Sequence, residues 1–185
     1  MATVDSITAI AHRLLKKYDT RDPSKICQEL GIMLRLRDLG DTLNAYYFVH
    51  SRMRVITVNN RLNSEAIKLY IAHELGHDQI PQHRQVARLH GFRSFDGLDL
   101  SSPYEFQANI FLAEFMISDS DLWELLKSEH SYQEIAELLQ VPRELLDVKY
   151  WLLKRQGFSL EPVNTVRGDF FRKGIPGVAT SHERP

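Results

Sequence analysis

The segment around residues 66–77 constrains the fold most, because it places three chemically active side chains in an otherwise apolar helical pattern. His73, Glu74 and His77 are the active side chains. Their neighbours on the helix are apolar: Ala66, Ile67, Leu69, Tyr70, Ile71, Ala72 and Leu75. A helix that is apolar on most sides is enclosed by other elements. We therefore expect the rest of the chain to pack around a helix of roughly residues 63–79.

The spacing of the two histidines indicates a metal site. His73 and His77 are four residues apart, so both imidazoles lie on one face of a helix. Glu74 lies beside them and could take a proton from a bound water, as in the His-Glu-x-x-His helix of zinc hydrolases. The alternative is two surface histidines with Glu74 in a solvated pair. A buried helix rarely carries three titratable groups without a partner, so the motif predicts metal ligands at His73 and His77 and a catalytic base at Glu74.

Composition limits the class of protein. A chain of 185 residues suits one domain with a core, or a domain with a small appendage. The net charge of −1 gives no general attraction to nucleic acid or to anionic membranes. Cys27 is the single cysteine, which excludes an intrachain disulfide and a cysteine-based zinc cluster. No secretory leader pattern or apolar run of membrane-spanning length is seen, so we expect a cytoplasmic protein with no membrane partner.

The order of the expected elements predicts an α+β fold. Apolar spacing, capping residues and β-branched runs indicate helices at 5–18, 22–30, 63–79, 103–117, 119–128, 131–140 and 142–156, and strands at 32–37, 45–50 and 55–59. A turn at Ser51-Arg52 joins the second and third strands. These elements predict a small antiparallel or mixed sheet packed on the metal helix, followed by a mostly helical C-terminal half.

Three units follow from this order. Residues 1–118 form the core with the metal site, and residues 119–157 form a helix-turn-helix-like subdomain packed on it. Residues 158–185 are rich in glycine and proline and are expected to be extended or partly disordered. Pro81 ends the metal helix, and residues 81–102 read as one long connection. Either this connection or the tail could control access to the site.

Two residues could complete a set of three metal ligands, which is what a catalytic zinc requires. His83 follows His77 by six residues, the spacing of an extended histidine motif that uses a glycine to turn the chain. Ile80 occupies that glycine position here. Glu105 is the other candidate, because the helix that carries it is apolar nearly all round and Asn109 follows one turn later. Ser102-Pro103-Tyr104-Glu105 also spells a capping box, in which Glu105 would only cap its helix.

Two segments resemble the ImmA/IrrE family of zinc metallopeptidases. The first is Ile71-Ala72-His73-Glu74-Leu75-Gly76-His77. The second is the helix from Glu105-Phe106-Gln107-Ala108-Asn109 to Met116, and the upstream strand 55–59 is also similar. The resemblance implies that His73, His77 and Glu105 bind one Zn²⁺ and that Glu74 is the base. It also implies a gluzincin-like endopeptidase that cleaves a helix-turn-helix repressor of a mobile element or phage.

Two positions depart from the family pattern. Ser118 stands where the family usually has a proline at the end of the helix, and Gln107 stands where many members carry a second acid. With glutamine there, Glu105 is the only carboxylate of that motif that could be a ligand.

Two questions of mechanism stay open at this level. An oxyanion needs a donor besides the metal, and His83, His90, Tyr104 and His130 are candidates by residue type. A peptide could add to the strand at 45–50 or at 54–59 if either forms a sheet edge.

Two rival functions also stay open. One is a non-catalytic zinc-containing regulator that acts by binding a transcription factor. The other is a DNA-binding protein that uses helices 131–140 and 142–156. The acidic and core-type residues of the second helix argue against a recognition surface, so direct binding to nucleic acid is not expected. The oligomeric state is not indicated by any pattern.

Overall fold

A computed structural model describes residues 2–95, 98–99 and 102–158. The described elements are α1 (Val4–Tyr18), α2 (Pro23–Glu29), β1 (Met33–Arg37), β2 (Ala45–His50), β3 (Met53–Asn59), α3 (Ser64–Gln79), α4 (Pro81–Leu89), β4 (Phe92–Ser94), α5 (Pro103–Met116), α6 (Asp119–Leu126), α7 (Tyr132–Leu138) and α8 (Arg143–Arg155). The α+β class with a helical C-terminal half is thereby confirmed. The tail expected at 158–185 lies, after Phe158, outside the described residues. No described helix is long and apolar enough to cross a membrane.

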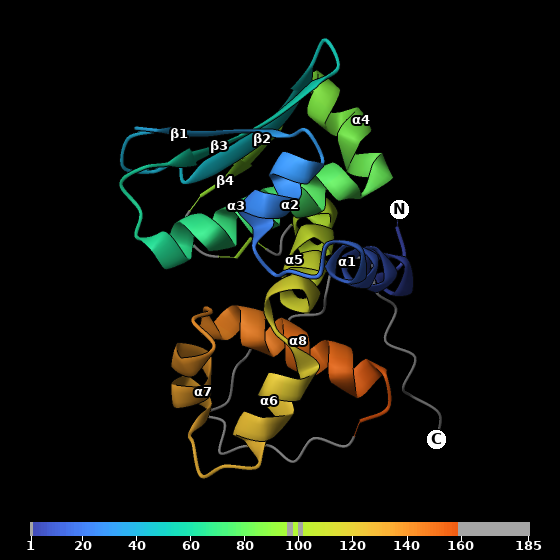
Figure 1. The fold of residues 1–185 in the computed structure, drawn as a ribbon, viewed down its shortest axis with the longest axis vertical. Coiled ribbons are helices and arrows are strands. Elements are labelled where there is room, and N and C mark those ends of the chain that lie inside the picture. Colours follow the sequence, from blue (N-terminus) through green and yellow to red (C-terminus); the bar gives the residue numbers. More distant parts are fainter. Residues whose placement is uncertain (1, 96–97, 100–101, 159–185) are drawn as a thin grey trace.

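The four strands form one mixed sheet in the order β1-β3-β2-β4. β1 is parallel to β3, while β2 is antiparallel to both β3 and β4. Ser51 and Arg52 both adopt positive φ angles, 47° and 71°, which is the turn that matches the twist of a two-residue hairpin. Tyr47 and Ile56 pair across β2 and β3 and are fully buried. Figure 1 shows the sheet lying along one side of α3.

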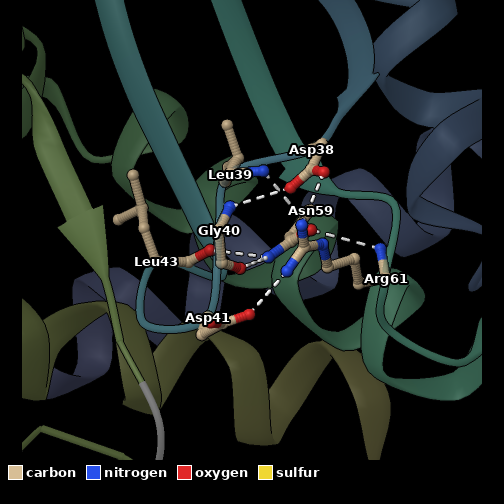
Figure 2. A network of polar contacts seen from close by, with 7 residues as sticks. All are labelled: Asp38, Leu39, Gly40, Asp41, Leu43, Asn59 and Arg61. Atoms are coloured by element: carbon tan, nitrogen blue, oxygen red, sulfur yellow. Dashed lines mark hydrogen bonds and ion pairs between the residues drawn. The ribbon is translucent and has the colours of Figure 1, made fainter.

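The polar side chain of Asn59 fixes the loop between β1 and β2. It lies at the end of β3, is 3% exposed, and donates through Nδ2 to the carbonyl oxygens of Gly40 and Leu43 at 2.8 and 3.0 Å. Its Oδ1 accepts from the backbone N–H of Arg61. The Arg61 guanidinium spans the same loop by pairing with Asp38 and Asp41 (Figure 2). The loop is therefore held on the sheet end beside the start of α3.

Helix α5 occupies the centre of the molecule (Figure 1). It packs against α1, α3 and α8, and every residue from Phe106 to Phe115 is buried. Gly76 of α3 lies at the contact with α5, where a Cβ would be 2.9 Å from Cδ1 of Phe111. The glycine thus permits the two central helices to approach closely.

A buried ion cluster connects α5 to the C-terminal helices. Lys149 of α8 is 1% exposed, and its ammonium lies 3.1 Å from the Glu114 carboxylate of α5 and 2.5 Å from Asp119 of α6. His12 of α1 contacts the same Glu114 oxygen at 2.8 Å. One carboxylate in the centre of the fold therefore contacts groups from both ends of the described chain.

The expectation of a single long connection at 81–102 is wrong. Residues 81–89 form α4, and residues 92–94 form β4, which pairs with β2. Pro81 both follows the end of α3 and occupies the first turn of α4, where proline needs no N–H partner. His83 and Ala87 form the buried face of α4. A strand of three residues is too short to show alternation in the sequence.

The added strand also changes which strands are edges. β3 lies between β1 and β2, and β2 lies between β3 and β4. Of the two segments expected to receive a peptide, 54–59 lies in the interior of the sheet, and 45–50 is covered by β4 over Ala45–Tyr47. The edge next to α3 and α5 is β4, and the other edge is β1.

Candidate metal centre

The two helices α3 and α5 bring His73, His77 and Glu105 together. The Nε2 atoms of the two histidines are 3.2 Å apart. Glu105 Oε2 lies 3.0 Å from His73 Nε2 and 3.4 Å from His77 Nε2. The Ser102 side chain makes no capping hydrogen bond. The carboxylate of Glu105 therefore faces the histidines and not the start of its own helix, unlike in a capping box.

These three side chains fit a divalent cation of the zinc type. Each offers one ligand atom, and the three atoms lie within 4.8 Å of one another. Two imidazoles and a carboxylate are the ligands of many catalytic zinc sites, which keep a further position open. Among the described residues, no other group of His, Cys, Asp or Glu meets the same criterion.

The electrostatics of the cluster also favour a cation. Burial would raise the pKa of Glu105, but its hydrogen bond with His73 and the close contact with His77 hold that pKa well below its usual range. Burial lowers the pKa of His77 to about 3. For His73, burial acts in the same direction, but the contacts with Glu105 and Asn109 and the charge of Glu74 together outweigh it, and the pKa is raised. At neutral pH the cluster thus contains an ionised carboxylate and an uncharged His77, the forms that bind metals.

Glu74 is fully buried beside this cluster. Its Oε1 accepts a hydrogen bond from the Ser94 hydroxyl at 2.6 Å, whereas its Oε2 has no hydrogen-bond partner among the described residues. Burial raises the pKa of Glu74 to about 7. A carboxylate with a pKa near neutrality and one open oxygen can exchange a proton with a water or substrate.

Strand β4 supports two of these residues at once. Phe92 and Ser94 are two positions apart, so both point to the same face of the sheet, toward α3. The Phe92 ring stacks on the His77 imidazole, with centroids 3.9 Å apart and an angle of 17° between planes, and Ser94 holds Glu74. The strand therefore fixes the orientation of one candidate ligand and of the candidate base.

The structure places His83 on the other side of His77. His83 Nδ1 lies 2.9 Å from Nδ1 of His77, the nitrogen that faces away from Glu105. Its own Nε2 contacts Oε1 of Gln107 at 2.9 Å. Burial lowers the pKa of His83 to about 4. His83 is thus a neighbour of the cluster, and Ile80 before it has φ of −83°, so the chain makes no left-handed turn there.

Asn109 lies one turn after Glu105 and is fully buried. Its Nδ2 donates to the carbonyl oxygen of Asp99 at 2.9 Å. The side chain also acts on His73, where it contributes to the raised pKa of that imidazole. A buried amide in this position can orient a neighbouring ligand side chain.

A cavity of about 620 Å³ opens at the cluster. His73 and Glu105 line it together with Tyr70, Arg93 and Ser94. The remaining wall is largely apolar and includes Leu69, Phe95, Leu98, Leu112 and Pro142. A cavity of this size, apolar with a few convergent polar groups, is typical of a site that binds part of a larger ligand.

Comparison with known proteins identifies the family. Residues 27–150 match a peptidase family described as the IrrE N-terminal-like domain. The chain belongs to this family. It is also 28% identical over 143 residues to "Uncharacterized immunity region protein 2" of Bacillus phage phi105, an alignment that covers 77% of this chain and 88% of the phage protein. The sequence resemblance is thereby confirmed, and the matched stretch includes α6, α7 and most of α8.

Of the four oxyanion candidates, none lines the cavity. His83 is buried behind His77, Tyr104 packs edge-on against His83, and His90 and His130 are exposed. Two other cavity residues carry donor groups: Arg93, and Tyr70, whose hydroxyl donates to the carbonyl oxygen of Phe95 at 3.1 Å. Tyr70 precedes His73 by three positions, so helical spacing could have revealed it. Arg93 and Ser94 gave no signal, because their role depends on the pairing of β4 with β2.

Proposed function

We propose that this member of the peptidase family is a zinc-dependent endopeptidase that hydrolyses a peptide bond in a protein substrate. The observation that carries the proposal is Oε2 of Glu74, which is buried without a hydrogen-bond partner among the described residues, beside a cluster of three candidate ligands of which His73 and Glu105 line a cavity. A buried oxygen without a hydrogen-bond partner lowers the stability of the fold, and such groups often have a catalytic role. His73, His77 and Glu105 would hold the ion.

When bound, the ion would supply Lewis acidity, polarising the scissile carbonyl and lowering the pKa of the attacking water. The chain supplies the remaining groups. Glu74 accepts the proton of the water through its open oxygen and passes it to the leaving amine. Ser94 holds the other oxygen of Glu74, so the carboxylate cannot rotate away. Arg93, at the cavity wall, stabilises the developing oxyanion.

The substrate we propose is a helix-turn-helix repressor of a mobile element or phage, bound in an extended form. The resemblance to a protein of a phage immunity region supports this class. β4 is the sheet edge at the cavity, and an extended peptide can add to an exposed edge through main-chain hydrogen bonds. The apolar wall at Leu69, Leu98 and Leu112 favours an apolar side chain next to the scissile bond.

The test uses purified wild type with Glu74→Gln and Glu105→Ala, each with zinc measured per chain by mass spectrometry. Cleavage is followed on a proteome-derived peptide library and on an intact helix-turn-helix repressor from the same genome. We expect about one zinc in wild type and in Glu74→Gln, and loss of zinc in Glu105→Ala. Cleavage should fall by about 10²–10⁴-fold in Glu74→Gln, the usual contribution of a general base. His90→Asn, an exposed imidazole, is the matched control.

Two results would count against the proposal. Equal cleavage by wild type and Glu74→Gln would remove Glu74 from the mechanism. Relief of repression by Glu74→Gln in cells, without cleavage, would favour the non-catalytic regulator. The DNA-binding alternative has little support, because α8 buries Leu145, Leu146, Val148, Lys149, Tyr150, Leu152 and Leu153. Such a helix has little exposed surface with which to enter a groove of DNA.

A further inference from the structure

A continuous chain of hydrogen bonds runs from His77 to the first residues of the protein. His77 Nδ1 meets His83 Nδ1 at 2.9 Å, and His83 Nε2 meets Gln107 Oε1 at 2.9 Å. Gln107 Nε2 donates to the carbonyl oxygen of Ala2 at 3.0 Å. The chain links α3, α4 and α5 to Ala2, two residues before α1, and it lies on the side of His77 that faces away from Glu105.

The carbonyl oxygen of Ala2 determines which group donates in each of these hydrogen bonds. A main-chain carbonyl only accepts, so Gln107 must place its amide nitrogen toward Ala2 and its oxygen toward His83. That oxygen also only accepts, so His83 must donate from Nε2. A buried imidazole that faces an amide and not a carboxylate stays uncharged. His83 therefore has its one proton on Nε2 and a lone pair on Nδ1.

The same logic fixes His77. Because His83 Nδ1 can only accept, His77 must donate from its own Nδ1. An uncharged His77 then has its lone pair on Nε2, the atom that lies 3.2 Å from His73 Nε2 and 3.4 Å from Glu105. The carbonyl of Ala2 thus determines which nitrogen of His77 is available as a ligand. Packing holds the relay in place, since the His83 ring contacts Tyr104 and Phe92 with centroids 5.1 and 5.5 Å apart.

We infer that His83 and Gln107 are positioning residues that lock His77 in the Nδ1–H tautomer and present its Nε2 to a divalent cation. The inference rests on the proposed metal site and does not depend on proteolysis. In this inference the role of α4 is to place His83 next to His77. It also gives a reason for glutamine at 107: an acid there could draw a second proton onto His83, which would then have no lone pair for His77.

The test measures affinity for Zn²⁺ by chelator competition in the full-length protein. His83→Phe keeps a ring but removes the acceptor, whereas His83→Asn retains an oxygen near the position of Nδ1. We expect His83→Phe to bind Zn²⁺ about 10–100-fold more weakly than wild type, the usual effect of losing a group that orients a metal-bound histidine. His83→Asn and the exposed control His90→Asn should stay within about threefold of wild type.

Two further measurements keep the inference testable if His83→Phe does not fold. Gln107→Met, which leaves the His83 ring in place, should also weaken Zn²⁺ binding and alter the visible absorption of the Co²⁺-loaded protein. Nitrogen-15 spectra of the zinc-loaded wild type should show the Nδ1–H tautomer for His77 and the Nε2–H tautomer for His83. The opposite tautomer at His83 would overturn the inference.

The outcomes separate this inference from the proposed function. Zinc binding by wild type with equal affinity in His83→Phe would overturn the relay alone. Equal losses in His83→Phe and His83→Asn would do the same, because packing and not the acceptor would then be responsible. A wild type that binds no Zn²⁺ would overturn both the relay and the proposed function.

Discussion

At the scale of single residues, Glu74 combines complete burial with a titratable charge. Its pKa is raised from 4.5 to about 7 because burial disfavours the ionised form. A group whose pKa is raised on folding stabilises the fold below its unfolded pKa and costs stability as the pH rises through the folded value. The metal-free protein should therefore lose stability through this group between pH 4.5 and 7.

Glu74→Gln should remove this cost. We expect the variant to gain free energy of unfolding relative to wild type by about 2 kcal/mol more at pH 8.5 than at pH 5, since a pKa raised from 4.5 to about 7 corresponds to at most about 3.5 kcal/mol. The measurement is urea unfolding of chelator-treated protein at both pH values. Glu65→Gln, an exposed glutamate of the same helix, is the control and should show no such difference. A pH-independent gain for Glu74→Gln would contradict the raised pKa.

The residue scale is also where sequence and structure agree most closely. His73 and His77 could be paired from their spacing, because one helix turn determines their geometry. Glu105 required the further argument that its helix is apolar all round, and the structure does bring the three side chains together. Ser94 could not be found, because its contact with Glu74 depends on strand pairing and not on local spacing.

At the scale of elements, the separation of α3 and α5 determines whether the cluster can form. Gly76 of α3 faces Phe111 of α5, and a Cβ would lie 2.9, 3.2 and 3.3 Å from three atoms of that side chain. Such distances force the phenylalanine or the helix to move. The helix that moves carries His73 and His77, and its partner carries Glu105.

Gly76→Ala should therefore destabilise the protein, by about 1–3 kcal/mol from overpacking, although alanine favours a helix by about 1 kcal/mol. Zinc affinity should fall in parallel. The measurements are denaturant unfolding and chelator competition. Phe111→Leu in the same chain should restore part of both losses, whereas strictly additive effects of the two substitutions would show that the contact is not responsible.

Element boundaries show why some of the fold escaped the sequence analysis. The helices at α1, α3, α5 and α8 have long periodic patterns, and their positions were predicted within a few residues. Pro81 indicates the end of α3, but proline is equally suited to begin the next helix, and α4 starts at this residue. β4 has only three residues, and its existence depends on pairing with β2. Long periodic patterns of apolar residues thus predict helices, whereas a short strand such as β4 forms only through tertiary contacts that no local pattern shows.

At the scale of the whole molecule, the ion cluster around Lys149 joins α1 and α5 to the C-terminal helices α6 and α8. Glu114 is fully buried, and Lys149 provides its charge partner from α8. Removal of one partner of a buried ion pair leaves an uncompensated charge, which typically costs about 3–5 kcal/mol. The division into a core and a helical subdomain, expected from the sequence, should therefore not appear as two folding units.

Lys149→Met tests this expectation. Both tryptophans, Trp123 and Trp151, lie in α6 and α8, so fluorescence reports on the C-terminal helices, whereas circular dichroism reports on all helices. We expect one transition by both probes in wild type and a joint shift of about 3 kcal/mol or more in the variant. Lys154→Met, at an exposed lysine of the same helix, should change little. A shift confined to fluorescence would show that the C-terminal helices unfold independently.

The hydrogen bond between Ala2 and Gln107 joins residues 105 positions apart in the chain. A ribosome releases the chain from its N-terminus, so α1 and α3 emerge well before α5 can cover them. Until then the two histidines lack both Glu105 and the relay that orients His77. A nascent chain from which α5 has not yet emerged therefore cannot bring His73, His77 and Glu105 together. The order of synthesis therefore delays metal binding by this cluster until α5 has emerged.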